Sequence, residues 1–134
     1  MMNVSDAVRK RRTTRGFLSA PVPEAMIREV LEIARHAPSN SNTQPWHLAI
    51  VSGAARERLQ AAIFAEINAG KTPYPTWPSG GVGLKGEYKE RQRACGFGYY
   101  ATMGVDRDDT RGRRELLLKN WEFFGAPHVA FLSM

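Results

Sequence analysis

Cysteine and long apolar runs are scarce in this sequence, and each scarcity excludes a class of protein. The single cysteine, Cys95, excludes an internal disulfide and cannot supply the thiolate cluster of a zinc site. No apolar run approaches the roughly 20 residues that a membrane-spanning helix needs. The basic residues near the N-terminus lack the following apolar stretch of a secretory signal. We therefore expect a cytoplasmic protein.

The spacing of the histidines and the distribution of charge further limit which ligands and partners the protein is expected to bind. The three histidines, His36, His47 and His128, do not have the spacing of metal ligands, so no metal site is expected. Nineteen lysines and arginines against thirteen acidic residues give a net charge of +6, which suits an anionic partner. The positive charge is spread over residues 9–15, 85–93 and 107–114 and is interleaved with acids. This distribution favours a solvated surface or a phosphate-bearing small cofactor over nucleic acid.

Hydrophobic residues make up 43% of the 134 residues and charged residues 24%, which is ordinary for one globular domain spanning residues 1–134. Periodicity and caps predict both helices and strands. The predicted helices cover residues 5–12, 23–37, 54–69, 87–103 and 108–124, and the predicted strands are buried and cover residues 46–52 and 128–134. Residues 71–86 are rich in proline and glycine and are expected to form a loop.

Particular residues support these helices. Ser5 or Asp6 is expected to cap the first helix, and Pro23 suits the first turn of the second. Ile27, Val30, Leu31 and Ala34 form an apolar stripe on the second helix, and Leu117, Trp121 and Phe124 are expected to share one face of the last.

The predicted strands are too few for a sheet that is stable by itself. Either a second chain supplies further strands, or the sequence is part of something longer.

A basic segment, residues 11–17 (RRTTRGF), follows the first predicted helix. Arg11, Arg12 and Arg15 offer planar donors that suit a phosphate, and Thr13 adds a hydroxyl. A flavin phosphate or the polar edge of the flavin ring would use such a group well. The alternative is a solvated basic tail that complements the helix dipole, and these residues alone favour that alternative.

A polar loop, residues 38–46 (PSNSNTQPW), lies between the second helix and the first strand. Its side-chain amides and backbone N–H groups could bind a planar heterocycle, and the prolines at both ends limit its freedom. Caps and turns would explain one or two of these residues but hardly all of them. Trp46 is expected to be a core residue behind the loop.

Two other patterns carry little weight. Gly81, Gly83 and Gly86 fit G-x-G-x-x-G, but no predicted strand precedes them and no βαβ unit surrounds them, so we interpret the match as fortuitous. Cys95 lies within a predicted helix, where an isolated cysteine usually packs, although a Cys–His nucleophilic pair stays open.

Taken in order, the segments at 11–17, at 37–46 (APSNSNTQPW) and at 120–127 (NWEFFGAP) resemble the nitroreductase family. Tyr74-Pro75 and Trp77-Pro78 look like a subgroup of it. The resemblance spans nearly the whole chain, and the ordered combination is far more specific than any one segment. The family pattern is longer than this chain, which is therefore expected to be its N-terminal part.

The resemblance implies an α+β fold that binds FMN at the interface of an intertwined homodimer. Arg11, Arg12, Thr13 and Arg15 would contact the flavin phosphate and ring edge, and Pro38, Ser39, Asn40 and Asn42 of the partner subunit would pack on the same flavin. Gln44 and Trp46 would hold the loop and strand in place. The implied activity is ping-pong electron transfer from NADH or NADPH to nitroaromatics, quinones or similar small acceptors, by chemistry that belongs to the cofactor. Two alternatives stay open, a truncated non-catalytic flavin-binding or dimerisation module and a basic nucleic-acid-binding domain.

Overall fold

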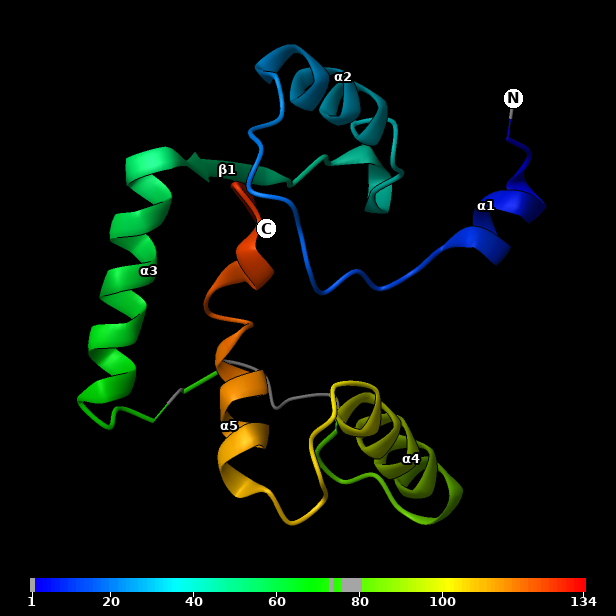
Figure 1. The fold of residues 1–134 in the computed structure, drawn as a ribbon. Helices are drawn as coiled ribbons and strands as arrows, with labels where there is room; N and C mark the ends of the chain where they lie inside the picture. The colour runs from blue at the N-terminus through cyan, green and yellow to red at the C-terminus, as the bar shows by residue number, and fades with distance from the viewer. Residues whose placement is uncertain (1, 73, 76–80) are drawn as a thin grey trace. The chain divides into compact units, whose positions relative to one another are not determined.

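The structure is a computed structural model that describes residues 2–72, 74–75 and 81–134 (Figure 1). It divides into two compact units. The first consists of Met1–Leu59 and Glu122–Met134, and the second of Gln60–Trp121. Among the described residues, no helix is both long enough and apolar enough to cross a lipid bilayer.

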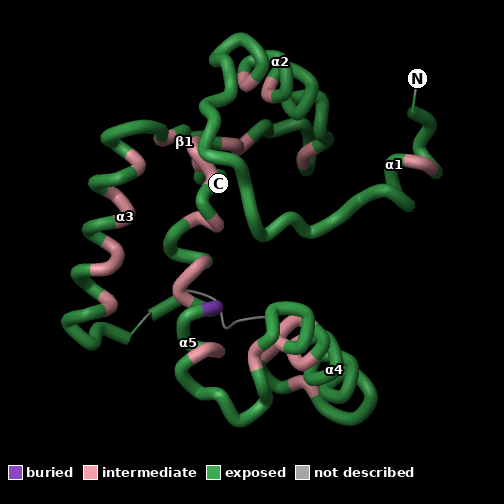
Figure 2. The backbone as a smooth tube through the Cα atoms, in the orientation of Figure 1, coloured by how far each residue is buried: buried purple, intermediate pink, exposed green. Residues whose placement is uncertain are grey.

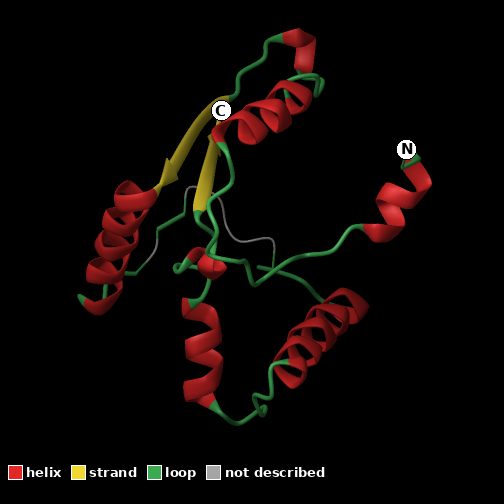
Figure 3. Ribbon diagram, turned by 45° about the horizontal axis from the view of Figure 1, so that its top comes forward, coloured by secondary structure: helices red, strands yellow, loops and turns green. Residues whose placement is uncertain are grey.

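The first unit holds both strands of the described residues. Its elements are α1 (Val4–Lys10), α2 (Glu24–Ala34), the 3₁₀ turn η1 (Asn40–Asn42), β1 (His47–Ser52), the start of α3 (Gly53–Asn68), the 3₁₀ turn η2 (Phe123–Gly125) and β2 (His128–Ser133). The strands pair antiparallel, from His47 opposite Ser133 to Ser52 opposite His128 (Figure 3). The α+β class and both predicted strands are confirmed.

The described residues of the second unit form helices joined by turns and loops. They include the rest of α3, then α4 (Gly86–Thr102) and α5 (Thr110–Leu118). Asp109 caps α5 through its side chain, which accepts a hydrogen bond of 2.8 Å from the Gly112 N–H. Leu116 is 6% exposed and is the one buried hydrophobic residue of the described chain (Figure 2).

The strands are more exposed than the apolar sequences of residues 46–52 and 128–134 predict. Leu48 and Ile50 on β1 are 42% and 39% exposed, and Phe131 and Leu132 on β2 are 44% and 65% exposed. The prediction of buried strands is wrong for this chain, because a two-stranded ladder leaves much of both strands uncovered. Trp46 is half-buried rather than a core residue and lies just before β1.

The last predicted helix, residues 108–124, is wrong at its C-terminal end. α5 stops at Leu118, where the Asn120 side chain and its backbone N–H both donate to the Leu117 carbonyl. Phe123 and Phe124 then adopt positive φ angles of 55° and 52°, which an α-helix cannot contain. The proposed apolar face of Leu117, Trp121 and Phe124 therefore does not form, and Leu117 is 63% exposed.

The other helices agree with prediction to within a few residues, and two details differ. Asn3, not Ser5 or Asp6, caps α1, and its side chain accepts a hydrogen bond of 2.8 Å from the Asp6 N–H. Pro23 is the residue before α2 rather than its first helical residue, and α2 ends at Ala34.

Gly83 and Gly86 of the glycine-rich match have positive φ, and α4 begins at Gly86. Residues 76–80, which include Trp77 and Pro78, lie outside the described residues.

Candidate functional site

The basic segment, residues 11–17, leaves the C-terminal end of α1 as extended, exposed chain. Arg12 Nη1 donates to the Arg9 and Arg11 carbonyl oxygens at 2.9 and 3.0 Å, which satisfies acceptors at the end of the helix. Arg11 Nη1 donates to Thr13 Oγ1 at 3.3 Å. Arg12 therefore does stabilise the end of α1, as the alternative interpretation predicts, but the two hydrogen bonds use only one of its guanidinium nitrogens.

Arg11 and Arg12 differ from other arginines of the chain in their electrostatic surroundings. Each of four other arginines pairs with a glutamate three or four residues away, namely Arg28, Arg35, Arg91 and Arg111. Neither Arg11 nor Arg12 has a carboxylate partner within the described ranges. Arg15 is exposed in the same segment. Without a carboxylate partner in the described chain, Arg11 and Arg12 keep their charge available to an anion from solution.

The polar loop, residues 38–46, is built by hydrogen bonds among its own members. Ser39 Oγ accepts from the Gln44 N–H at 2.9 Å, and the Ser39 carbonyl accepts from the Asn42 N–H at 3.0 Å. The Asn40 carbonyl accepts from both the N–H and the hydroxyl of Thr43. These bonds hold Ser39, Asn40 and Asn42 in one compact turn around η1.

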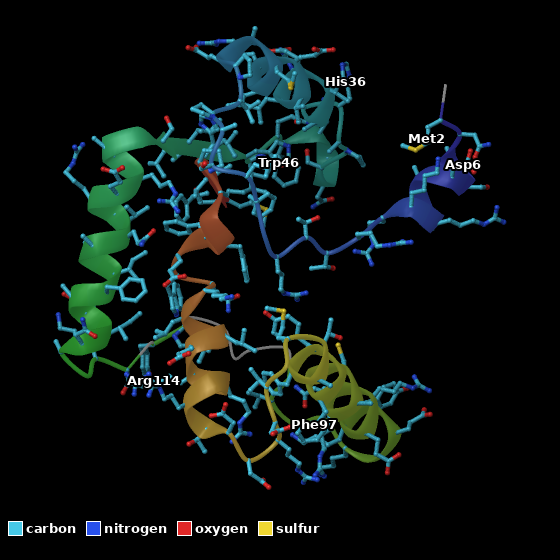
Figure 4. All side chains as sticks on the ribbon, viewed as in Figure 1. Met2, Asp6, His36, Trp46, Phe97 and Arg114 are labelled. Carbon is cyan, nitrogen blue, oxygen red and sulfur yellow. The ribbon has the colours of Figure 1, made fainter. Side chains whose placement is uncertain are left out.

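A relay of side-chain hydrogen bonds joins this loop to the start of β1. Gln44 Nε2 donates to Asn42 Oδ1 at 2.9 Å, and Gln44 Oε1 accepts from Trp46 Nε1 at 3.0 Å. Trp46 lies where the loop enters the strand (Figure 4). These bonds support the sequence-based interpretation that Gln44 and Trp46 hold the loop.

A groove of about 450 Å³ adjoins the loop, and its walls include Trp46, the last residue of the loop, and Ala37, the residue before the loop. The lining is almost wholly apolar and consists of Leu31, Ala34, Arg35, Ala37, Trp46, Leu48 and Leu132. An apolar cleft beside a few convergent polar groups is the usual form of a site for a small planar molecule.

The structure thus brings the predicted site residues together as two clusters. Arg11, Arg12, Thr13 and Arg15 lie in the basic segment, and Pro38, Ser39, Asn40 and Asn42 lie in the polar loop. Each cluster is bonded within itself, and the contact of either with a ligand stays a prediction. Among the described residues no group of three histidine, cysteine or acidic side chains could hold a metal ion.

Sequence reasoning missed Arg56. This half-buried residue of α3 donates to two backbone carbonyls near η2, at 2.6 Å to Ala126 and 2.8 Å to Glu122. The sequence carries a weak signal for it. This arginine lies in the predicted helix at 54–69, and no acidic residue stands three or four positions away to pair with it.

The fold and these clusters define an α+β protein with a basic segment and a rigid polar loop beside an apolar groove. The profile of the Nitroreductase family matches residues 8–132. The chain therefore belongs to the nitroreductase family, as the resemblance of its three segments predicts.

Curated relatives agree with this assignment. The chain is 42% identical over 125 residues to nitroreductase NfnB of Mycolicibacterium smegmatis, which covers 93% of this chain and 53% of the relative. It is 37% identical over 121 residues to a 4-nitrobenzoate reductase of Pseudomonas putida, covering 90% of this chain and 52% of that protein. The chain thus spans about half the length of these relatives.

Solved structures match the fold as well. The FMN and NADPH-dependent nitroreductase NfnB from sphigopyxis sp. strain HMH superposes with a TM-score of 0.87 at 36% identity, covering 97% of this chain and 59% of that one. The FMN-dependent nitroreductase NfnB from Mycobacterium smegmatis in complex with NADPH gives 0.84 at 39% identity, covering 97% and 60%.

Proposed function

We propose that this chain forms the flavin-binding part of an oxidoreductase that passes electrons from NADH or NADPH to nitroaromatics, quinones or similar small acceptors. The observation that carries the proposal is the match of 97% of the chain, at a TM-score of 0.87, to a nitroreductase described as FMN and NADPH-dependent. A cytoplasmic location accords with the single cysteine.

The residues present fit FMN. Arg11 and Arg12 offer guanidinium donors that have no carboxylate partner in the described chain and suit the phosphate, and Thr13 Oγ1 lies beside Arg11. Ser39, Asn40 and Asn42 offer polar groups from a loop already held by its own hydrogen bonds. The apolar groove beside them suits a flat ring system. Bound FMN supplies hydride transfer from the nicotinamide and then reduction of an acceptor in the same place, which gives ping-pong kinetics.

The chain's own part is to bind and orient. Arg11, Arg12, Thr13 and Arg15 would hold the phosphate and the polar ring edge. Pro38, Ser39, Asn40 and Asn42 would pack against the ring from a second subunit, in a homodimer. The large apolar residues that stay exposed on β1 and β2 support association of two chains, because such surface is ordinarily covered.

The test is flavin binding and turnover on the purified chain. We expect FMN to bind with its visible absorbance band, and NAD(P)H to be consumed when a nitroaromatic is added. Arg11→Gln should weaken FMN binding about tenfold, because a charge-assisted hydrogen bond is lost. Arg28→Gln is the matched control, since that arginine is exposed and paired with Glu24 on α2, and it should leave FMN affinity unchanged.

Different outcomes separate the alternatives. A folded protein that binds no added FMN would contradict the proposal. Flavin binding and dimerisation without any turnover would instead identify a non-catalytic module. Steeply salt-dependent binding of DNA or RNA, in place of flavin, would identify a nucleic-acid-binding domain.

A further inference from the structure

The turn before β2 has an unusual backbone. Phe123, Phe124 and Gly125 follow one another with φ angles of 55°, 52° and 78°. Left-handed backbone disfavours residues with a Cβ, and two consecutive phenylalanines have no local side-chain hydrogen bond to offset the strain. We call residues 122–126 the diphenylalanine turn. Its conformation needs support from elsewhere in the fold.

Arg56 provides that support from α3. Its Nε donates to the Ala126 carbonyl at 2.6 Å and its Nη2 to the Glu122 carbonyl at 2.8 Å, so the guanidinium joins the two ends of the turn. The guanidinium carbon also lies 5.4 Å from the centre of the Phe123 ring, within range of a cation–π contact. The planar fork of an arginine can make these contacts at once, and a lysine cannot.

The diphenylalanine turn in turn holds the basic segment. The Phe124 carbonyl accepts a hydrogen bond of 3.2 Å from the Phe17 N–H, although the two residues are far apart in the sequence. A Cβ built on Gly125 would lie 3.6 Å from the Phe17 carbonyl oxygen, which shows how closely the two backbones approach. Phe17 is the last residue of the basic segment and follows Arg15 by two positions.

We propose that Arg56 is a positioning residue for the phosphate end of the flavin site, acting through the diphenylalanine turn on the basic segment. The inference rests on the proposed function, which assigns the basic segment to the FMN phosphate and the polar ring edge. Arg56 does not touch the ligand. It holds the turn, the turn fixes the Phe17 backbone, and Phe17 limits where the neighbouring arginines can lie.

This role differs in a measurable way from a merely structural one. Riboflavin has the flavin ring but no phosphate. Loss of Arg56 should therefore weaken binding of FMN by a clearly larger factor than binding of riboflavin, which can lose only the contacts of the basic segment with the ring edge. General damage to the fold would weaken binding of both ligands alike.

The experiment compares wild type, Arg56→Met, Arg56→Lys and the control Arg58→Met, which removes an exposed arginine from the same helix. Hydrogen exchange of the Phe17 amide and dissociation constants for FMN and riboflavin are measured on each. In Arg56→Met we expect the Phe17 amide to exchange about tenfold faster and FMN to bind about tenfold more weakly, with a clearly smaller loss for riboflavin. Arg56→Lys should fall between Arg56→Met and wild type, and Arg58→Met should match wild type.

If the wild type binds FMN, any of three results would contradict the role of Arg56 without contradicting the proposed function. They are an unchanged Phe17 exchange rate, an unchanged FMN affinity, and an equal loss for FMN and riboflavin. Should Arg56→Met fail to fold, the same comparisons are decided by Arg56→Lys, which keeps the charge and the stem. A folded wild-type chain that binds no FMN overturns the proposed function and this role together.

Discussion

Gln44 makes three hydrogen bonds, through its backbone N–H, its amide nitrogen and its amide oxygen, to Ser39, Asn42 and Trp46. It does so at a φ angle of 46°, in the left-handed region that disfavours residues with a Cβ. The side chain therefore stabilises a loop conformation that the backbone at the same position opposes.

These opposing effects predict an unusual order of stability for two variants. Gln44→Ala should lower the free energy of unfolding by about 1–2 kcal/mol, because two side-chain hydrogen bonds are lost and the strain remains. Gln44→Gly loses the same bonds but relieves the strain, so it should be at least as stable as the alanine variant. Urea denaturation of both variants measures the difference. A glycine variant clearly less stable than the alanine variant would contradict the left-handed conformation.

At the scale of elements, α2 presents one stripe to the sheet and another to solvent. Ile27 and Leu31 are half-buried, and Leu31 lines both the groove beside Trp46 and a second cavity of about 330 Å³ next to Ile50. Val30 and Ile33 are 60% and 67% exposed. The helix is thus attached through its Ile27–Leu31 side.

Alanine substitutions on the two faces of α2 should change the free energy of unfolding by different amounts. Leu31→Ala should lower the free energy of unfolding by about 1–2 kcal/mol, because it removes apolar contacts with the β1 side. Ile33→Ala should change it by less than about 0.5 kcal/mol, because that side chain is already largely in water. Thermal and urea unfolding of the two variants compare them directly. Equal losses would show that α2 does not pack as described.

The elements also show what sequence can predict. The predicted stripe of Ile27, Val30, Leu31 and Ala34 is right only in part: Ile27 and Leu31 are half-buried, whereas Val30 and Ala34 are exposed. The end of α5 was missed because the left-handed Phe123 and Phe124 follow from contacts with α3 and the basic segment, which local propensity does not contain. The residues of both candidate clusters follow from the family resemblance of their segments, and their contact with a ligand stays a prediction. The partners of Arg56 could not, because they lie far along the chain.

At the scale of the whole molecule, apolar surface stays exposed on the strands. Leu48 and Leu132 lie opposite each other on the ladder and are 42% and 65% exposed. Directly opposite residues of an antiparallel pair project from the same face, so they form one patch. Both residues also line the groove proposed for the flavin ring, so we expect a dimer that binds flavin at its interface to cover this patch.

A higher protein concentration should therefore raise the thermal stability of the protein. A dimer that dissociates on unfolding gains stability by mass action, so Tm should rise by several degrees over a hundredfold increase in protein concentration. Leu132→Lys should abolish that rise, whereas Leu117→Lys, at a position 63% exposed on α5, should preserve it. Differential scanning fluorimetry and sedimentation velocity measure both effects. A monomer with a constant Tm would contradict the expected dimer.

The pairing of β1 with β2 has a consequence for protein synthesis. Because α3, α4 and α5 all lie between the two strands in the chain, β1 leaves the ribosome well before its partner exists. At ordinary translation rates this interval is on the order of ten seconds. Throughout it, the Leu48 and Ile50 side chains and both edges of β1 are open to other nascent chains on the same message. Chaperones that act on nascent chains would find β1 during that interval, and the yield of native protein should depend on how quickly residues 53–127 are translated.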